Sequence, residues 1–268
     1  MEDKIAFIGA GMMGGAIIKS LIKGNYAGKI TAVDVSSDKL KELEKIGVET
    51  SSDSRKAISE ADIIFVVVKP YDVERVLRDN CEEIKGKILV SAAAALPLKY
   101  LIERAPESRV VRIMPNLCVM AQAAYTAFCC GDNVTVEDKK KITELLNMMG
   151  ICNEVEEKHL AAITAMSGSG PGYMSIIVEA LEYAGLKVGL PRNIALACAA
   201  QTVMGTAKLI LDLNEEPAKI RDMTTTPGGT TIETIYQIEK SQIRTAMVKA
   251  IEKGTKKSQT ILEKLEIK

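Results

Sequence analysis

Glycines near the start of the chain have the spacing that binds a phosphate group. Gly9, Gly11 and Gly14 form a G-x-G-x-x-G motif, which directly follows a short apolar run and opens an amphipathic helical pattern. There the first glycine allows a tight turn, the second lets a pyrophosphate approach the backbone, and the third lets the helix pack closely on the strand. The phosphates then lie against free N–H groups at the positive end of the helix. The motif alone is weak, but this strand-and-helix context predicts a dinucleotide site.

An acidic residue lies twenty positions beyond the motif, at the end of the second strand-like run. Asp34 is placed to accept hydrogen bonds from the adenosine ribose hydroxyls and to repel a 2′-phosphate. No arginine follows it, because the next residues are Val35, Ser36 and Ser37. Charge therefore favours NADH over NADPH. Asp34 could also cap the helix that follows, and the two roles are compatible.

Lys69 is a further candidate for contact with the nucleotide. It follows the strand-like run that ends in Val66, Val67 and Val68, and Pro70 comes after it. Parallel sheets hold ligands at the carboxyl ends of their strands, so this side chain could reach a ribose or a pyrophosphate. The alternative is a solvated lysine at a strand end.

Two loops in the second half of the chain are rich in glycine and hydroxyl groups, where simple packing would favour alanine and leucine. They are Ser167–Tyr173 and Thr224–Thr231, and each precedes a helical pattern. Both can present backbone N–H groups and hydroxyls at a helix N-terminus, which is a ready site for a carboxylate. Each could instead be only a capped turn. Two such loops in one helical region favour binding.

Alternating elements in the first half must position the glycine motif. Short runs rich in Ile and Val predict buried parallel strands at Lys4–Ile8, Lys29–Val33, Ile63–Val68, Lys87–Val90 and Arg109–Ile113. Tyr125–Cys130 predicts a further strand. Amphipathic patterns predict helices at Met12–Lys23, Ser37–Ile46 and Val136–Met149, with an N-terminal cap in Ser36–Asp38 for the second. This alternation predicts an α/β fold with a doubly wound sheet and right-handed crossovers.

After about residue 157 the pattern becomes entirely helical. Patterns rich in Ala, Leu and Ile predict helices at Tyr173–Val188, Pro191–Leu211, Pro217–Met223, Thr231–Glu239 and Gln242–Leu265. We therefore divide the chain into a nucleotide-binding domain, residues 1–156, and an all-helical domain, residues 157–268. Ala195–Ala207 is more apolar than a monomer of this size needs, which predicts helix packing between subunits.

Composition argues against several classes of protein. The 35 basic and 35 acidic residues balance, so neither nucleic acid nor a membrane surface is expected as a partner. We expect no apolar run long enough to cross a membrane and no signal peptide, which favours a cytoplasmic location. The single histidine, His159, is expected to be a solvated surface residue. Six scattered cysteines without a Cys-x-x-Cys pair predict neither a disulfide framework nor a metal site.

Further motifs extend along essentially the whole chain. The C-terminal ones are Ala165–Tyr173, Gly189–Arg192, Ala200–Val203, Arg221-Asp222 and Thr226–Thr231. The N-terminal half adds Phe7–Met13, Val68–Pro70 and Met114–Asn116. In the order and spacing of these motifs the chain resembles the pyrroline-5-carboxylate reductase family, and the C-terminal motifs are the specific part of the resemblance.

This resemblance implies a Rossmann-type N-terminal domain and a C-terminal all-helical dimerisation domain that intertwines with a neighbour's. Active sites then lie at the dimer interface, and dimers commonly join in fives as a decamer. The implied reaction is reduction of 1-pyrroline-5-carboxylate to L-proline, the last step of proline biosynthesis, with NADH or NADPH. A cyclic iminium is electrophilic without a metal or a strong acid, so such a protein mainly aligns donor and acceptor.

The resemblance also implies roles for individual residues. Thr231 would lie beside the imine nitrogen and be able to supply its proton, within a loop that holds the substrate carboxylate. The implied substrate-binding residues are Thr226, Gly228, Gly229, Thr230, Thr231, Glu215 and Ser167. The implied cofactor-binding residues are Gly9, Gly11, Met12, Met13, Gly14, Asp34, Val68, Lys69, Pro70 and Asn116.

Several positions depart from the family pattern. Leu117 and Cys118 stand where the family usually has Thr-Pro, Ala95 and Ala124 stand where it favours glycine, and Ser54 replaces an asparagine that often faces the cofactor. A hydrophobic pocket distinguishes one methylene by only about 1–3 kcal/mol, so another cyclic imine acid, such as a six-membered ring, is an alternative substrate. A non-catalytic nucleotide-binding regulator with the same fold is a second alternative.

Overall fold

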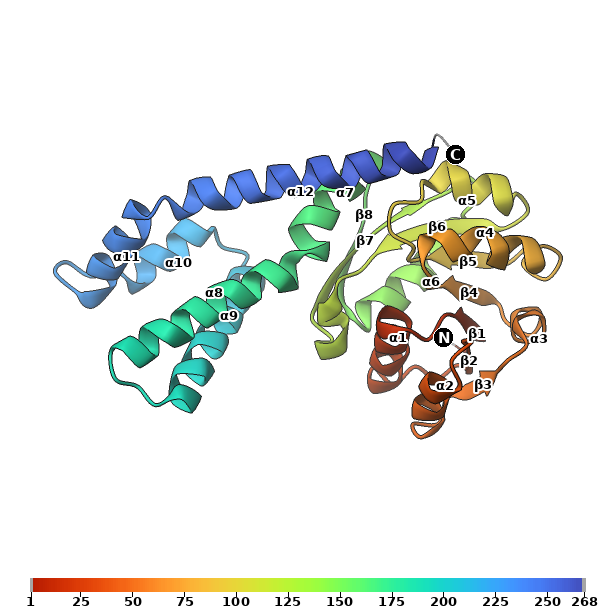
Figure 1. Cartoon of the computed structure of the whole chain (residues 1–268), viewed down its shortest axis with the longest axis horizontal. Coiled ribbons are helices and arrows are strands. Elements are labelled where there is room, and N and C mark those ends of the chain that lie inside the picture. Colours follow the sequence, from red (N-terminus) through yellow and green to blue (C-terminus); the bar gives the residue numbers. More distant parts are fainter. Residues whose placement is uncertain (1, 267–268) are drawn as a thin grey trace. The chain divides into compact units, whose positions relative to one another are not determined.

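The computed structural model describes residues 2–266 of the chain (Figure 1). These residues form two compact units. The first comprises residues 2–169 together with residues 254–266, and the second comprises residues 170–253.

The first unit is built on one eight-stranded sheet with the strand order β3-β2-β1-β4-β5-β6-β7-β8. The strands are β1 (Ile5–Ile8), β2 (Ile30–Val33), β3 (Glu49–Ser51), β4 (Ile63–Val66), β5 (Ile88–Ser91), β6 (Arg109–Met114), β7 (Ala124–Cys130) and β8 (Gly150–Glu154). All neighbours pair in parallel except β6 and β7. The first six strands have the order of a Rossmann fold, and the expected doubly wound sheet is confirmed.

Helices cover both faces of this sheet. The longer ones are α1 (Met12–Lys23), α2 (Ser37–Glu44), α3 (Ser54–Ser59), α4 (Pro70–Asp79), α5 (Leu98–Arg104) and α6 (Val136–Asn147). The short helical segments are η1 (Leu117–Ala121), η2 (Glu157–His159), α7 (Leu160–Ile163) and η3 (Thr164–Gly168), the last a π-helical turn.

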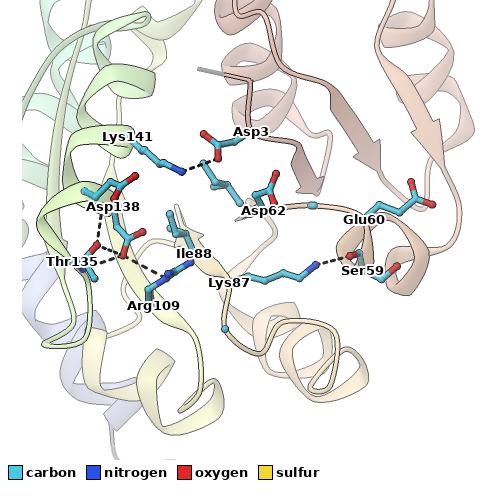
Figure 2. A pocket seen from close by; sticks show the side chains of 14 residues that line it. Asp3, Ser59, Glu60, Asp62, Lys87, Ile88, Arg109, Thr135, Asp138 and Lys141 are labelled. Carbon is cyan, nitrogen blue, oxygen red and sulfur yellow. Dashed lines mark hydrogen bonds and ion pairs between the residues drawn. The ribbon is translucent and has the colours of Figure 1, made fainter.

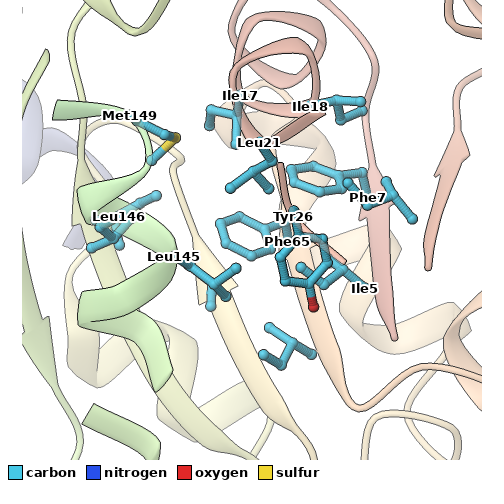
Figure 3. Packing of buried hydrophobic residues seen from close by; sticks show 14 of the residues in the cluster. Ile5, Phe7, Ile17, Ile18, Leu21, Tyr26, Phe65, Leu145, Leu146 and Met149 are labelled. Atoms are coloured by element: carbon cyan, nitrogen blue, oxygen red, sulfur yellow. The ribbon is translucent and has the colours of Figure 1, made fainter. Parts of the chain in front are cut away.

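Side-chain alternation along the strands creates the two cores of the first unit. Ile5 and Phe7 of β1 face the cluster that contains buried residues of α1, α2 and α6 (Figure 3). Ala6 and Ile8 face the cluster that contains buried residues of α3, α4 and α5. The rings of Phe7 and Phe65 stack in the first cluster with centroids 4.6 Å apart. Burial on both faces explains why the central strands are continuous apolar runs.

The two strands at the sheet edges, β3 and β8, were not predicted. Both lack the apolar run that marks the central strands, with the sequences Glu-Thr-Ser and Gly-Ile-Cys-Asn-Glu, and neither has a fully buried residue. An edge strand has only one neighbour and stays partly solvated, so its sequence carries little apolar signal. The third predicted strand is also shorter than expected, because β4 ends at Val66.

The start of α2 also differs from its prediction. Ser36 occupies the N-cap position, but its side chain makes no capping hydrogen bond. Its backbone N–H donates to Oδ1 of Asp34 at 2.9 Å instead. Asp34 therefore stabilises the turn that leads into the helix and does not cap the helix itself, although the alternative interpretation of that residue expected a cap.

The second unit consists of helices, and no strand occurs in residues 157–266. It contains α8 (Gly170–Lys187), α9 (Arg192–Leu213), α10 (Pro217–Thr224), α11 (Thr230–Lys240) and the start of α12 (Ile243–Glu266). Helices α8 and α9 form a hairpin, in which Arg192 Nη1 lies 2.5 Å from Oε1 of the buried Glu182. A Cβ at Gly185 would lie 2.7 Å from that of Ala195, so glycine permits the close helix contact.

Large apolar side chains of this unit are widely exposed, among them Ile176, Tyr183, Met204, Leu211 and Tyr236. By length and composition, helix α9 could cross a membrane, and only 11% of its most apolar 18-residue stretch is buried. The expectation that no apolar run reaches that length is therefore wrong. A single helix of this kind is weak evidence for a membrane span, and an apolar face can equally be covered by another protein subunit.

Ala95 adopts a backbone conformation that favours glycine, with φ at +63°. A left-handed conformation costs an L-residue about 1–2 kcal/mol. Replacing alanine by glycine also raises the conformational entropy of the unfolded chain, which lowers stability by about 0.4–1 kcal/mol. Ala95→Gly should therefore stabilise the protein by up to about 1 kcal/mol in urea unfolding at fixed protein concentration. Ala94, which lies outside the left-handed region, provides the control, and Ala94→Gly should destabilise. Equal losses in both variants would show that Ala95 stores no strain.

Candidate active site

A cleft of about 750 Å³ lies at the carboxyl ends of β1, β2 and β4. The strand order reverses between β1 and β4, which is where an open α/β sheet binds ligands. The cleft is lined by most of the predicted cofactor residues, namely Gly9, Gly11, Met12, Met13, Asp34, Val68, Lys69 and Pro70. Of the others, Gly14 and Asn116 do not line it, although Leu117, next to Asn116, does.

The three glycines of the motif differ in what requires them. Gly9 has φ at +106°, and a Cβ on it would lie 2.5 Å from the carbonyl oxygen of Val67. A Cβ on Gly14 would lie 2.0 Å from the carbonyl oxygen of Gly9, so this residue permits the contact between helix and strand. A Cβ on Gly11 would meet nothing within 4 Å. The protein itself therefore requires glycine at positions 9 and 14, while the space beside Gly11 faces the cleft.

The N-terminus of α1 is suited to phosphate. Gly11 is the N-cap residue, no side chain caps the helix, and no acidic residue lies in its first turn. Free N–H groups at a helix start bind phosphate oxygens, and the helix dipole adds to the attraction. Across the cleft, the exposed Lys69 is the N-cap residue of α4 and Pro70 occupies its first turn. These residues fit the pyrophosphate of a dinucleotide.

Asp34 is more enclosed than a ligand-binding carboxylate need be, since its side chain is 8% exposed. The N–H of Ala10 donates to Oδ2 at 2.8 Å, and the N–H of Ser36 donates to Oδ1 at 2.9 Å. Burial alone would raise the pKa of Asp34, but these two hydrogen bonds and the nearby Lys39 ammonium outweigh it and lower the pKa. Asp34 is therefore a charged group that links the glycine loop to the start of α2.

Several polar residues of the cleft were not named as cofactor contacts from the sequence. Lys39, Ser52, Ser54 and Arg75 all line it. Lys39 and Arg75 lie on exposed helix faces, where a charged residue is ordinary, so their types carry no signal before the fold is known. In the sequence, Ser54 stands out only as a departure from the family pattern.

Asn116 and Ser167 contact each other, far apart as they are in sequence. Nδ2 of Asn116 donates to the hydroxyl of Ser167 at 2.9 Å and to its carbonyl at 3.2 Å. Oδ1 of Asn116 accepts from the N–H of Cys118 at 3.0 Å. Asn116 is 8% exposed, so its amide joins η1 to the π-helical turn η3 from inside the first unit.

In the second unit, the loop between α10 and α11 brings five of the predicted substrate residues together. Gly228 has φ at +67°, and the N–H of Gly229 donates to the carbonyl of Thr226 at 3.1 Å. Gly229 is the N-cap residue of α11, and no side chain caps that helix. Thr231 is half-buried in the first turn, beside the exposed Thr230. Backbone N–H groups and hydroxyls are thus available to a carboxylate. Glu215 is exposed and precedes α10.

A second cavity, of about 620 Å³, lies at the amino ends of β4, β5 and β6, the edge of the sheet away from the glycine motif (Figure 2). Its cationic side chains contact acceptors of the protein itself. Lys141 lies 2.9 Å from Asp3, Arg109 lies 3.5 Å from Asp138, and Lys87 donates to the carbonyl of Ser59 at 2.8 Å. This internal pairing leaves the cavity without the free donors of the glycine cleft. Within residues 2–266 no three His, Cys, Asp or Glu side chains gather as metal ligands.

Models of known protein families match both parts of the chain. Residues 157–261 match the family model for pyrroline-5-carboxylate reductase dimerisation, and residues 4–95 match that for NADP oxidoreductase, coenzyme F420-dependent. The pyrroline-5-carboxylate reductase of Methanosarcina acetivorans is 36% identical over 98% of this chain and 99% of its own length. That of Arabidopsis thaliana is 33% identical over 96% and 95%. The chain belongs to the pyrroline-5-carboxylate reductase family.

Solved structures of the family have the same fold. The enzyme from Coxiella burnetii has a TM-score of 0.90 at 30% identity and covers 97% of this chain and 99% of its own. The Plasmodium falciparum pyrroline carboxylate reductase, solved with NADP bound, has a TM-score of 0.84 at 27% identity and covers 97% and 98%. The expected family and the Rossmann-type and helical architecture are thereby confirmed.

Gly11 offers a test of the cofactor cleft that separates binding from stability. Its φ of −66° and ψ of −167° are open to alanine. Gly11→Ala should therefore unfold at the wild-type temperature, while NADH and NADPH bind at least about tenfold more weakly, a loss of about 1.4 kcal/mol. Fluorescence titration of each reduced cofactor measures this affinity.

Gly15→Ala is the matched control, because its Cβ would make only an ordinary contact, 3.5 Å from the carbonyl of Ala10. Wild-type affinity in both variants would show that the pyrophosphate does not approach Gly11.

Proposed function

We propose that this protein reduces 1-pyrroline-5-carboxylate to L-proline with NADH or NADPH. The proposal rests on one observation: this member of the family has two candidate anion-binding sites of different kinds. One is the cleft beside the uncapped N-terminus of α1, and the other is the hydroxyl-rich loop at the uncapped N-terminus of α11. A dinucleotide and a small carboxylic acid are the two ligands that such a pair fits.

The substrate's carboxylate would bind at the start of α11. The N–H groups of its first turn would hold the carboxylate oxygens, and the hydroxyls of Thr226, Thr230 and Thr231 lie within or beside the same loop. Gly228 and Gly229 shape that loop, with Gly228 in the left-handed conformation. A carboxylate fixed by several donors leaves a small ring little rotational freedom, which is the orientation that the reaction needs.

NADH or NADPH, when bound, would supply a hydride to the imine carbon, and a neutral imine nitrogen would also take one proton to give the secondary amine. Thr231 is the residue proposed to face the nitrogen, because it is half-buried at the start of α11. Its hydroxyl can orient the iminium, or pass a proton from water to the nitrogen where the imine binds in its neutral form. Glu215 is proposed to lie near the substrate or the ribose, and its carboxylate would favour a positively charged ring nitrogen.

The cofactor-binding residues remain those of the first unit. The N-terminus of α1, with Gly11, Met12 and Met13, would hold the pyrophosphate, and Lys69 would add a positive charge across the cleft. Asn116 and Ser167 would act through each other, since Asn116 uses both ends of its amide within the protein. Their contact would fix the wall of the cleft that Leu117 lines.

The exposed apolar helices of the second unit fit self-association. The matched family model is one for dimerisation and covers residues 157–261. We propose a dimer that buries the apolar faces of α8 and α9, and dimers joined as a decamer as the larger assembly. The division into domains at residue 157 belongs to the same proposal. The six cysteines are free, which suits the proposed reducing cytoplasm.

The direct test follows oxidation of NADH and NADPH with five-membered and six-membered cyclic imine acids in parallel. We expect turnover of 1-pyrroline-5-carboxylate, with L-proline as the product identified by mass spectrometry. Turnover of only the six-membered ring would replace the proposed substrate with its homologue. Tight cofactor binding without turnover of either ring would favour a nucleotide-binding regulator.

Thr231→Ala should lower kcat by about tenfold or less, because a self-activated iminium needs orientation more than acid catalysis, which typically contributes about 10²–10⁴. The affinity for NADPH should stay unchanged in fluorescence titration. Thr234→Ala, one turn later on α11, is the control and should keep wild-type turnover. A cofactor-binding defect as large as the turnover defect would remove Thr231 from the substrate site.

A further inference from the structure

The Asp34 carboxylate already has partners on both sides. The N–H of Ala10 donates to Oδ2 at 2.8 Å across 24 residues of chain, and the N–H of Ser36 donates to Oδ1 at 2.9 Å. Ala10 lies between the glycine that turns the backbone and the glycine that faces the cleft. The Asp34 side chain is only 8% exposed. Its two hydrogen bonds therefore hold the glycine loop in place.

The charge of Asp34 is also compensated. Lys39 Nζ lies 3.4 Å from Oδ1 of Asp34, and the Lys39 side chain is 48% exposed and lines the cleft. A carboxylate with an ammonium beside it repels a phosphate far less than a bare carboxylate does, and the exposed ammonium can itself bind the phosphate.

The other carboxylates of the cleft are paired as well. Asp72 lies 2.9 Å from Nη2 of Arg75, and Asp79 lies 3.2 Å from Nε of Arg78. Each aspartate that lines the cleft therefore has a cationic neighbour. Among the described residues of the cleft, no carboxylate is left to exclude a 2′-phosphate.

We propose that Asp34 is a positioning residue for the glycine loop and that Lys39 lets the cleft accept the 2′-phosphate of NADPH. The sequence alone favours NADH, because it shows the acid at the end of β2 without its partners. The inference rests on the proposed use of a nicotinamide dinucleotide. With Asp34 held by these contacts and paired with Lys39, NADPH should be used at least as well as NADH.

Direct cofactor binding tests Lys39 without relying on turnover of any imine. Lys39→Gln should weaken NADPH binding by about tenfold, the scale of one charge-assisted hydrogen bond, and change NADH binding by less than about twofold. Lys41→Gln is the matched control, because Lys41 lies on the same helix, pairs with Asp38 and does not line the cleft. Adenosine 2′,5′-bisphosphate should compete with NADPH less well in Lys39→Gln than in wild type.

Substitutions of Asp34 separate the two roles of that residue. Asp34→Ser should weaken both cofactors in parallel, so that their affinity ratio stays within about threefold, because it removes the bond to the glycine loop. Asp34→Asn, which keeps one acceptor oxygen, should lie between Ser and wild type. Melting temperatures measured without cofactor show whether each variant is folded.

Two results would overturn the inference. One is an Asp34→Ser or Asp34→Asn protein that binds NADPH better than wild type does while NADH binding falls, because Asp34 would then act as the acid that selects NADH. The other is unchanged NADPH affinity in Lys39→Gln. If the wild-type protein does not reduce any imine, this result would count against the proposed reaction alone, because the cofactor-binding measurements do not depend on turnover.

Discussion

The close approach of Gly14 to Gly9 is the constraint on which the nucleotide end of this protein depends. A Cβ at position 14 would lie 2.0 Å from the carbonyl oxygen of Gly9, so only glycine lets α1 begin directly after β1. That tight turn places the free N–H groups of the helix at the crevice between β1 and β4. A larger side chain would push α1 away and move these donors from the cleft, whatever the rest of the sheet did.

Because this turn is tight, the hydrogen bond from the N–H of Ala10 to Asp34 is important for holding the loop in place. The turn at Gly9 has a positive φ, and the next residue is held by Asp34 from the end of β2. Two neighbouring strands thus determine the path of one loop. A phosphate-binding backbone is effective when its N–H groups are held in place before the ligand arrives, so rigidity here contributes directly to affinity.

The sequence predicts the interior of the sheet far better than its edges. The central strands are buried on both faces, and this burial produces continuous runs of Ile and Val that stand out from their surroundings. The edge strands β3 and β8 are short and polar, and they pair only because a neighbouring strand already exists. The helices of the second unit were predicted within a few residues, since glycine and proline mark several of their ends.

The sequence predicts the backbone turn of the glycine loop but not the groups that hold this loop in place. Glycine spacing reports a local turn, so the motif could be found without a fold. The bonds from Ala10 to Asp34 and from Asn116 to Ser167 join segments distant in sequence, and no local pattern encodes them. Lys39 gives no sign of its role for the same reason: an exposed lysine on a helix is common, and only its distance from Asp34 distinguishes it.

The reaction itself places few demands on side chains, which leaves specificity to the shape of the cleft. A cyclic iminium needs a hydride donor and a fixed orientation, and the loop before α11 offers the groups for the second. What remains is the fit of the ring. Leu117 stands where the family usually has a hydroxyl residue, lines the cleft and is 39% exposed. An apolar side chain there discriminates between occupants of the cleft by contact area, at about 1–3 kcal/mol per methylene, and offers no hydrogen bond.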